Sequence, residues 1–219
     1  MQDQIYTTLK KKILSGGLQP DVIYSETKTA AELGVSKTPV KAAILRLSQE
    51  NYVRIIPSKD FCLREITSED IWEIYRVRTA VEGYCAVLLM QQKDTPAGKE
   101  TIRKLRECVE ALRCLMQQQK GSRDEDLVTA QLENNVVFHQ TIVDFSKSKK
   151  LLELFQSHCQ SILKSTSENY RSFPRMEQIC QEHQQIIDLI QGGDELACYH
   201  AVEEHMRRTR DNSLKIRLE

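Results

Sequence analysis

The chain has 219 residues, of which 40% are hydrophobic, enough for one large folded domain or two smaller ones. Its 31 basic and 31 acidic residues cancel, so the overall charge indicates neither a nucleic acid nor an acidic substrate as a partner. Seven cysteines are scattered singly, no secretory leader is apparent, and no apolar run reaches the roughly 20 residues that span a bilayer. We therefore expect a soluble cytoplasmic protein with reduced thiols.

The amino-terminal third has the pattern of three short helices followed by a β-hairpin. The first helix is expected over residues 4–14, where apolar side chains recur four positions apart. The second and third are expected over 25–33 and 37–50, with a tight turn at Gly34 between them. The run YVRIIPSKDFCLREI then indicates two short strands around a polar turn. This order predicts a winged helix-turn-helix domain in residues 1–66.

Residues 67–219 lack strand patterns and contain about six predicted helices. These are expected over residues 68–92, 97–120, 124–146, 148–169, 175–191 and 194–214. Short breaks such as DTPAG, SKSK and QGGD separate them, which favours an antiparallel bundle large enough to enclose a pocket. The expected fold is thus mostly α, with a winged helix-turn-helix domain followed by an all-helical domain.

The stretch GVSKTPVKAAILRL in the third helix has two chemically different faces. Ser36, Lys37, Thr38 and Lys41 offer hydroxyls and cations, whereas the apolar side chains between and after them can pack on the domain. Taken alone, such lysines are more often part of a solvated surface. Their position after a tight glycine turn and before a predicted wing favours a recognition helix.

These motifs resemble a known family. The runs ILSGGLQPD and ETKTAAELGVSKTPVKAAILRLSQENYVRIIPSKDF resemble the DNA-binding domain of the GntR family of bacterial transcription regulators, and the helical remainder resembles its FCD branch. The resemblance implies a ligand-responsive regulator, usually a repressor. It further implies that the residues approaching DNA are Glu26, Thr27, Lys28, Lys37, Thr38, Lys41, Ser58 and Lys59. Because DNA half-sites are read by two-fold dimers, we expect a palindromic operator of double-stranded DNA and a homodimer formed mainly through the helical domain.

Four residues of the helical domain have the spacing of a metal site. Asn135 and His139 lie four positions apart on one predicted helix, and His183 and His205 lie on the last two helices. Three imidazoles and a short oxygen ligand suit a divalent transition metal. The FCD resemblance implies the same ligand set, with two histidines 22 residues apart, although the family usually has aspartate at the position of Asn135. The neutral ligands favour zinc or nickel over magnesium or calcium.

Arg78 and Glu82 lie four positions apart in the first helix of the bundle, where a surface ion pair is one interpretation. The resemblance implies another, in which Arg78 faces an effector pocket and grips a carboxylate with its planar guanidinium. We expect a small organic acid as effector, with Asn135 also in the pocket.

Two alternatives remain open from the sequence. One is a regulator of the same fold whose metal-free pocket binds an acyl ligand. The other is a metal-dependent helical enzyme, because three histidine ligands with an open position can activate water. The sequence offers no general base beside the histidines, no Gly-rich phosphate loop and no nucleophile elbow, so we do not expect an enzyme.

Overall fold

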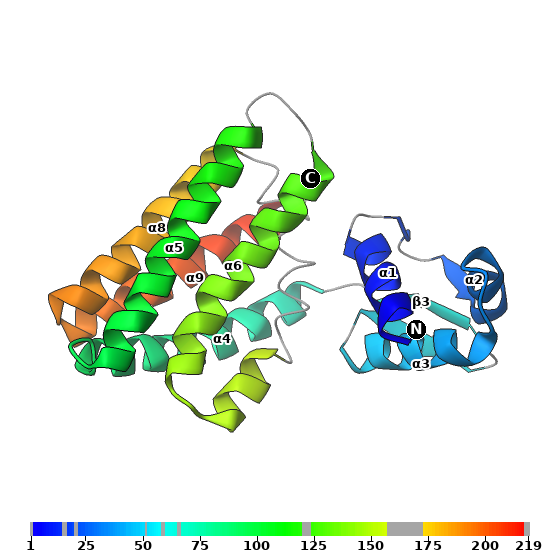
Figure 1. Ribbon diagram of the computed structural model, residues 1–219, viewed down its shortest axis with the longest axis horizontal. Helices are drawn as coiled ribbons and strands as arrows, with labels where there is room; N and C mark the ends of the chain where they lie inside the picture. Colours follow the sequence, from blue (N-terminus) through cyan, green and yellow to red (C-terminus); the bar gives the residue numbers. More distant parts are fainter. Residues whose placement is uncertain are drawn as a thin grey trace. The chain divides into compact units, whose positions relative to one another are not determined.

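A computed structural model describes residues 2–14, 17–19, 22–50, 52–57, 60–64, 67–119, 124–156 and 173–216. The chain divides into two units, Met1–Ile66 and Thr67–Glu219. Helices dominate both units, and the strands form one small sheet in the first (Figure 1). The predicted mostly helical fold, with a winged helix-turn-helix domain ahead of a helical bundle, is confirmed.

The first unit contains three helices around a small apolar core. They are α1 (Gln2–Leu14), α2 (Glu26–Glu32) and α3 (Lys37–Gln49). Helix α3 packs against α1 and α2, and it buries Val40, Ile44 and Leu47 completely. These residues recur at three- and four-residue intervals, so they line one side of the helix and leave the other side to solvent.

The turn between α2 and α3 depends on Gly34, whose φ of 65° is rarely adopted by residues with a side chain. Its N–H donates to the carbonyl of Ala31 at 3.1 Å, which closes the end of α2. Ser36 follows at the N-cap position of α3 with an extended backbone, but its side chain makes no capping hydrogen bond. Ser36 is exposed, and its hydroxyl does not cap the helix.

The sheet has three antiparallel strands in the order β1-β3-β2, with β1 Ile23–Ser25, β2 Val53–Ile56 and β3 Asp60–Leu63. Strands β2 and β3 are the predicted hairpin. Strand β1 was not predicted, because three residues are too few to show an alternating pattern. It forms through pairing with β3, where the ring of Tyr24 stacks on Phe61 at a centroid distance of 5.7 Å.

The second unit is a helical bundle. Its helices are α4 (Ser68–Gln91), α5 (Pro96–Gln119), α6 (Glu125–Phe145), α8 (Phe173–Gly192) and α9 (Glu195–Ile216), with a further helical stretch over residues 149–156. The predicted helix over 148–169 lies partly outside the described residues. Helix α4 packs mainly on α9, α5 on α6, and α8 on both α5 and α9 (Figure 1). None of the described helices combines the length and the apolar character that crossing a bilayer requires.

Helix α4 starts at a capping box. The N–H of Asp70 donates to the Thr67 hydroxyl at 3.1 Å, and the Asp70 carboxylate accepts from the Thr67 N–H at 2.9 Å. Two backbone donors that the helix cannot satisfy internally are thereby paired. The bundle therefore begins at a defined residue, directly after the first unit in sequence.

We predict that Leu47→Ala destabilises the first unit, because it removes a completely buried side chain from the face of α3 that contacts α1. The expected loss is about 2–5 kcal/mol of unfolding free energy. Hydrogen exchange followed by mass spectrometry on the full chain measures it, since peptides from α1 and α3 should exchange faster than in the wild type. Leu45→Ala is the control, because Leu45 lies on the same helix and is 51% exposed. Equal exchange in the two variants would contradict the assigned packing.

Candidate metal centre

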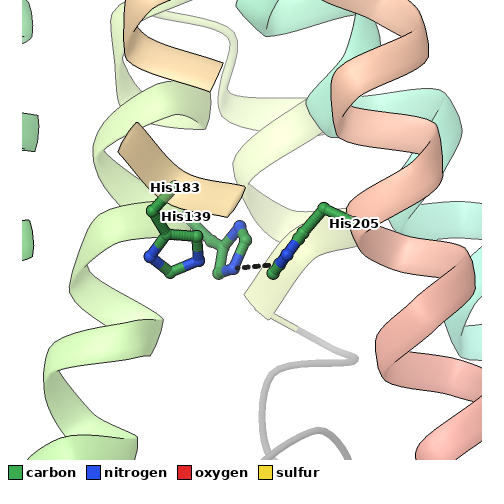
Figure 2. A group of neighbouring side chains, drawn as sticks. All are labelled: His139, His183 and His205. Atoms are coloured by element: carbon green, nitrogen blue, oxygen red, sulfur yellow. Dashed lines mark hydrogen bonds between the residues drawn. The ribbon is translucent and has the colours of Figure 1, made fainter. Parts of the chain in front are cut away.

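Three buried histidines from three different helices meet inside the bundle. His139 comes from α6, His183 from α8 and His205 from α9 (Figure 2). Each of the three is at most 2% exposed. Nε2 of His139 lies 3.3 Å from Nε2 of His205, and one ring nitrogen of each histidine lies within 4.8 Å of the others. The structure thus brings together the three histidines that the sequence predicted as metal ligands.

The ring of His183 is held by stacking on a phenylalanine. Phe138 and His183 lie nearly parallel, with 3.8 Å between their ring centroids, and Phe138 also meets His139 edge to face. Nε2 of His183 is buried and has no hydrogen-bond partner in the described part of the chain. A buried nitrogen without a partner costs about 1–3 kcal/mol, so this atom is better accounted for as a ligand than as a packing group.

A buried ion pair on α4 contacts His139. Arg78 donates from Nε to Oε1 of Glu82 at 2.7 Å, and Oε2 of Glu82 lies 2.5 Å from Nδ1 of His139. Arg78 and Glu82 are 2% and 0% exposed. The two residues therefore form an ion pair inside the bundle. The interpretation as a surface ion pair is wrong, because this face of α4 packs toward α6 rather than facing solvent.

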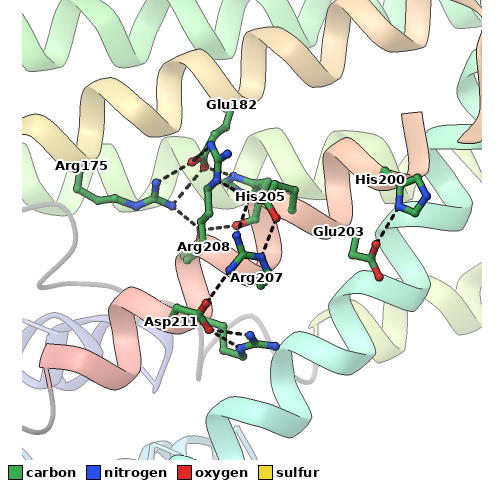
Figure 3. A network of polar contacts seen from close by, with 11 residues as sticks. Arg175, Glu182, His200, Glu203, His205, Arg207, Arg208 and Asp211 are labelled. Atoms are coloured by element: carbon green, nitrogen blue, oxygen red, sulfur yellow. Dashed lines mark hydrogen bonds and ion pairs between the residues drawn. The ribbon is translucent and has the colours of Figure 1, made fainter. Parts of the chain in front are cut away.

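A second buried ion pair contacts His205. Oε2 of Glu182 lies 2.7 Å from Nδ1 of His205, and Arg175 holds the same carboxylate through two hydrogen bonds of 2.8 and 3.2 Å (Figure 3). Arg175 also donates to the hydroxyl of Thr209 at 2.9 Å. The sequence motifs did not point to Arg175 or Glu182. Their seven-residue spacing, which puts both on one face of α8, is the signal that could have suggested the pair.

Electrostatics keep the imidazoles neutral. Burial lowers the pKa of His139 and His183 well below the usual range, and the cationic Arg78 adds to this effect at both. Burial also lowers the pKa of His205, although Glu182 opposes that shift. Burial alone would raise the pKa of Glu182, but His205 and Arg175 outweigh it and lower the value to about 2. Neutral imidazoles are the form that binds metal ions.

The cluster fits a transition-metal ion. Nitrogens bound to one ion at about 2.0–2.1 Å in tetrahedral geometry lie about 3.3 Å apart, which matches the separation between His139 and His205. One ring nitrogen of each histidine lies within 4.8 Å of the others, so all three surround one position. Asn135 is buried one helical turn before His139, on the same side of α6, and remains a predicted fourth ligand.

Apart from Ser58 and Lys59, the predicted DNA-contacting residues lie on α2 and α3 or at the N-cap of α3. Those with exposed side chains are Thr27, Lys28, Ser36, Thr38 and Lys41. Glu26 is buried instead, and its Oε2 lies 3.7 Å from Nζ of the half-buried Lys37, so this ion pair joins the beginnings of the two helices. The predicted wing residues Ser58 and Lys59 lie outside the described residues.

Comparisons with known proteins match both units. Residues 1–61 match the model of the gntR family of bacterial regulatory proteins, and residues 73–208 match the FCD domain. The chain is 26% identical over 202 residues to the uncharacterized HTH-type transcriptional regulator YdhC of Bacillus subtilis, covering 92% of this chain and 86% of that protein. It is 29% identical over 135 residues to the gluconate operon transcriptional repressor of the same organism, covering 62% of this chain and 51% of the repressor.

Solved structures have the same fold. The Escherichia coli protein McbR/YncC superposes with a TM-score of 0.74 at 22% identity, covering 98% of this chain and 97% of that one. A GntR regulator from Rhodococcus sp. RHA1 gives a TM-score of 0.75 at 18% identity, with the same coverage. These relatives are regulators rather than enzymes, in agreement with the sequence prediction. The chain belongs to the GntR family of DNA-binding bacterial transcription regulators and carries the FCD domain at its carboxyl-terminal end.

Proposed function

We propose that this regulator is a ligand-responsive repressor whose helical domain holds a divalent transition metal, zinc or nickel, at His139, His183 and His205. The observation that carries the proposal is the convergence of three buried imidazoles, two of which have Nε2 atoms 3.3 Å apart. The Nε2 atom of the third histidine, His183, is buried without a hydrogen-bond partner in the described chain, and a bound metal would give it one. A metal bound there would supply a Lewis-acidic position for an anionic ligand.

The effector that we propose is a small organic acid bound beside this metal. Imidazole ligands are neutral, so the ion keeps its positive charge and favours an anionic ligand at an open position. Arg78 and Asn135, both buried near His139 on neighbouring helices, are the residues that we propose to face its carboxylate. Metal and effector binding would then reinforce each other.

DNA binding is assigned to the exposed start of α3 and the neighbouring start of α2. Thr38 and Lys41 lie on the side of α3 opposite its buried stripe, and the pairing of Lys37 with Glu26 keeps the beginning of α2 close by. We expect a homodimer on a palindromic operator, since two copies of this short surface double the number of phosphate and base contacts. Effector binding would shift the population between dimer geometries that bind DNA tightly and weakly.

Protein purified without chelators should contain about one transition-metal ion per chain, because the three neutral imidazoles form one site. His183→Ala should lose the ion, as measured by elemental analysis and by zinc titration against a competing chelator. At a zinc concentration 100-fold above Kd, the wild type should gain about 2.7 kcal/mol of unfolding free energy.

The control for the metal experiment is His200→Ala. His200 is exposed on the same helix as His205, and Oε2 of the exposed Glu203 lies 3.0 Å from its Nδ1. This variant should bind zinc like the wild type. A wild-type chain that takes up no metal but binds an acyl thioester tightly would refute the metal site and support the metal-free alternative.

Operator binding should weaken steeply with salt, because cationic side chains release counterions from the phosphates they contact. If a dimer neutralises about 6–8 phosphates, log K should fall against log salt concentration with a slope of roughly −5 to −7. Lys41→Ala should reduce the slope by about one for each subunit. Fluorescence anisotropy with DNA that flanks the gene measures both quantities. Lys104→Ala, an exposed lysine of α5, should leave the slope unchanged, and a flat salt dependence of the wild type would refute this mode of DNA binding.

A further inference from the structure

Two of the three clustered histidines, His139 and His205, each have a buried glutamate beside Nδ1. Nδ1 of His139 lies 2.5 Å from Oε2 of Glu82, and Nδ1 of His205 lies 2.7 Å from Oε2 of Glu182. On the opposite side of each ring, the two Nε2 atoms face each other at 3.3 Å. The carboxylates come from α4 and α8, so each imidazole is contacted by an acid from a different helix.

The contact with Glu182 determines which nitrogen of His205 carries the proton. The Glu182 carboxylate, held by Arg175, accepts hydrogen bonds, so the proton of the neutral His205 imidazole is on Nδ1 and its lone pair is on Nε2. Nδ1 of His139 and Oε2 of Glu82 lie 2.5 Å apart without hydrogen-bond geometry, so this contact fixes the position of the ring rather than its proton. Nε2 of His139 lies 3.3 Å from Nε2 of His205, and with one ion bound to both Nε2 atoms the proton of His139 is on Nδ1, toward Glu82.

Each carboxylate is in turn fixed by an arginine of its own helix. Arg78 lies one turn before Glu82 on α4 and holds Oε1, which leaves Oε2 directed to His139. Arg175 lies two turns before Glu182 on α8 and contacts both oxygens. Both acids are almost inaccessible to solvent, so their orientation is set by these partners rather than averaged by water.

We infer that Glu82 and Glu182 are positioning residues for the metal, which orient His139 and His205 so that both present Nε2 to one ion and carry their protons on Nδ1 when it is bound. The inference rests on the proposed metal site and extends it to four residues outside the ligand set, the two glutamates and their arginines. A carboxylate behind a ligating imidazole also raises the basicity of the ligand. Because Asn135 is neutral, the negative charge near the metal comes from the glutamates on the far side of the two imidazoles.

The first test needs no substitution. The zinc-loaded wild-type chain, labelled with ¹⁵N at histidine, is studied by long-range ¹H–¹⁵N correlation spectroscopy, which distinguishes protonated from metal-bound ring nitrogens. The signals of His139 and His205 should show a proton on Nδ1 and zinc on Nε2. Zinc on Nδ1 of either residue would overturn the inference. A purely structural role of the glutamates would not determine which nitrogen binds the metal.

The second test removes the negative charge of each glutamate and keeps the size of its side chain. Glu182→Gln should weaken zinc binding by about 10- to 100-fold, measured by competition with a chelator, and Glu82→Gln should act in the same way through His139. In Glu182→Gln, the histidine spectrum should also show that the Nδ1–H preference of His205 is reduced. These readouts separate positioning from a general loss of stability, which would not alter the tautomer of one ring.

The control is Glu203→Gln. Glu203 contacts Nδ1 of His200 at 3.0 Å on the same helix α9 as His205, but both residues are exposed and lie apart from the cluster (Figure 3). This variant should bind zinc like the wild type. If Glu182→Gln and Glu203→Gln bind zinc equally well, the positioning role is refuted and the metal site stands. If the wild type binds no zinc at all, it is the proposed metal site that fails.

Discussion

Burying ionisable groups inside a helical bundle is costly unless each group is paired, and this constraint organises the second domain. Two arginines, two glutamates and three histidines lie in its interior. Arg78 is paired with Glu82 and Arg175 with Glu182, so the charges cancel within each helix. The remaining carboxylate oxygens are directed at imidazoles rather than at water. The polar interior is therefore one connected network, and removing one member leaves its partner buried without compensation.

This network links helices that are distant in sequence. Glu82 on α4 contacts His139 on α6, while Glu182 on α8 contacts His205 on α9. The two Nε2 atoms then connect both halves across 3.3 Å. Helix α4 begins at the capped Thr67, directly after the DNA-binding domain in sequence. We expect an ion or effector that moves these side chains to act on α4, the helix through which the chain leaves that domain.

In the DNA-binding domain, helix α3 has a buried side that packs on the domain and an exposed side. In α3, a completely buried apolar stripe fixes the helix on α1, and the opposite side presents Thr38 and Lys41 to solvent. Lysine at this surface is a point charge without the planar fork with which arginine contacts guanine. We therefore expect these side chains to contact phosphates rather than to discriminate between bases. The N-cap Ser36 adds a hydroxyl that the helix itself does not use.

Local pattern alone determined much of this protein, because the helices and the hairpin follow from side chains a few positions apart in sequence. It could not determine strand β1, which exists only because β3 lies beside it. Nor could it assign partners across helices. Glu182 is adjacent to His183 in sequence but contacts His205, because neighbouring residues of a helix point about 100° apart. The packing of α4 likewise decided whether Arg78 and Glu82 lie on the surface or inside the bundle. Sequence spacing specifies which residues share a helix face, but only tertiary contacts specify what that face packs against.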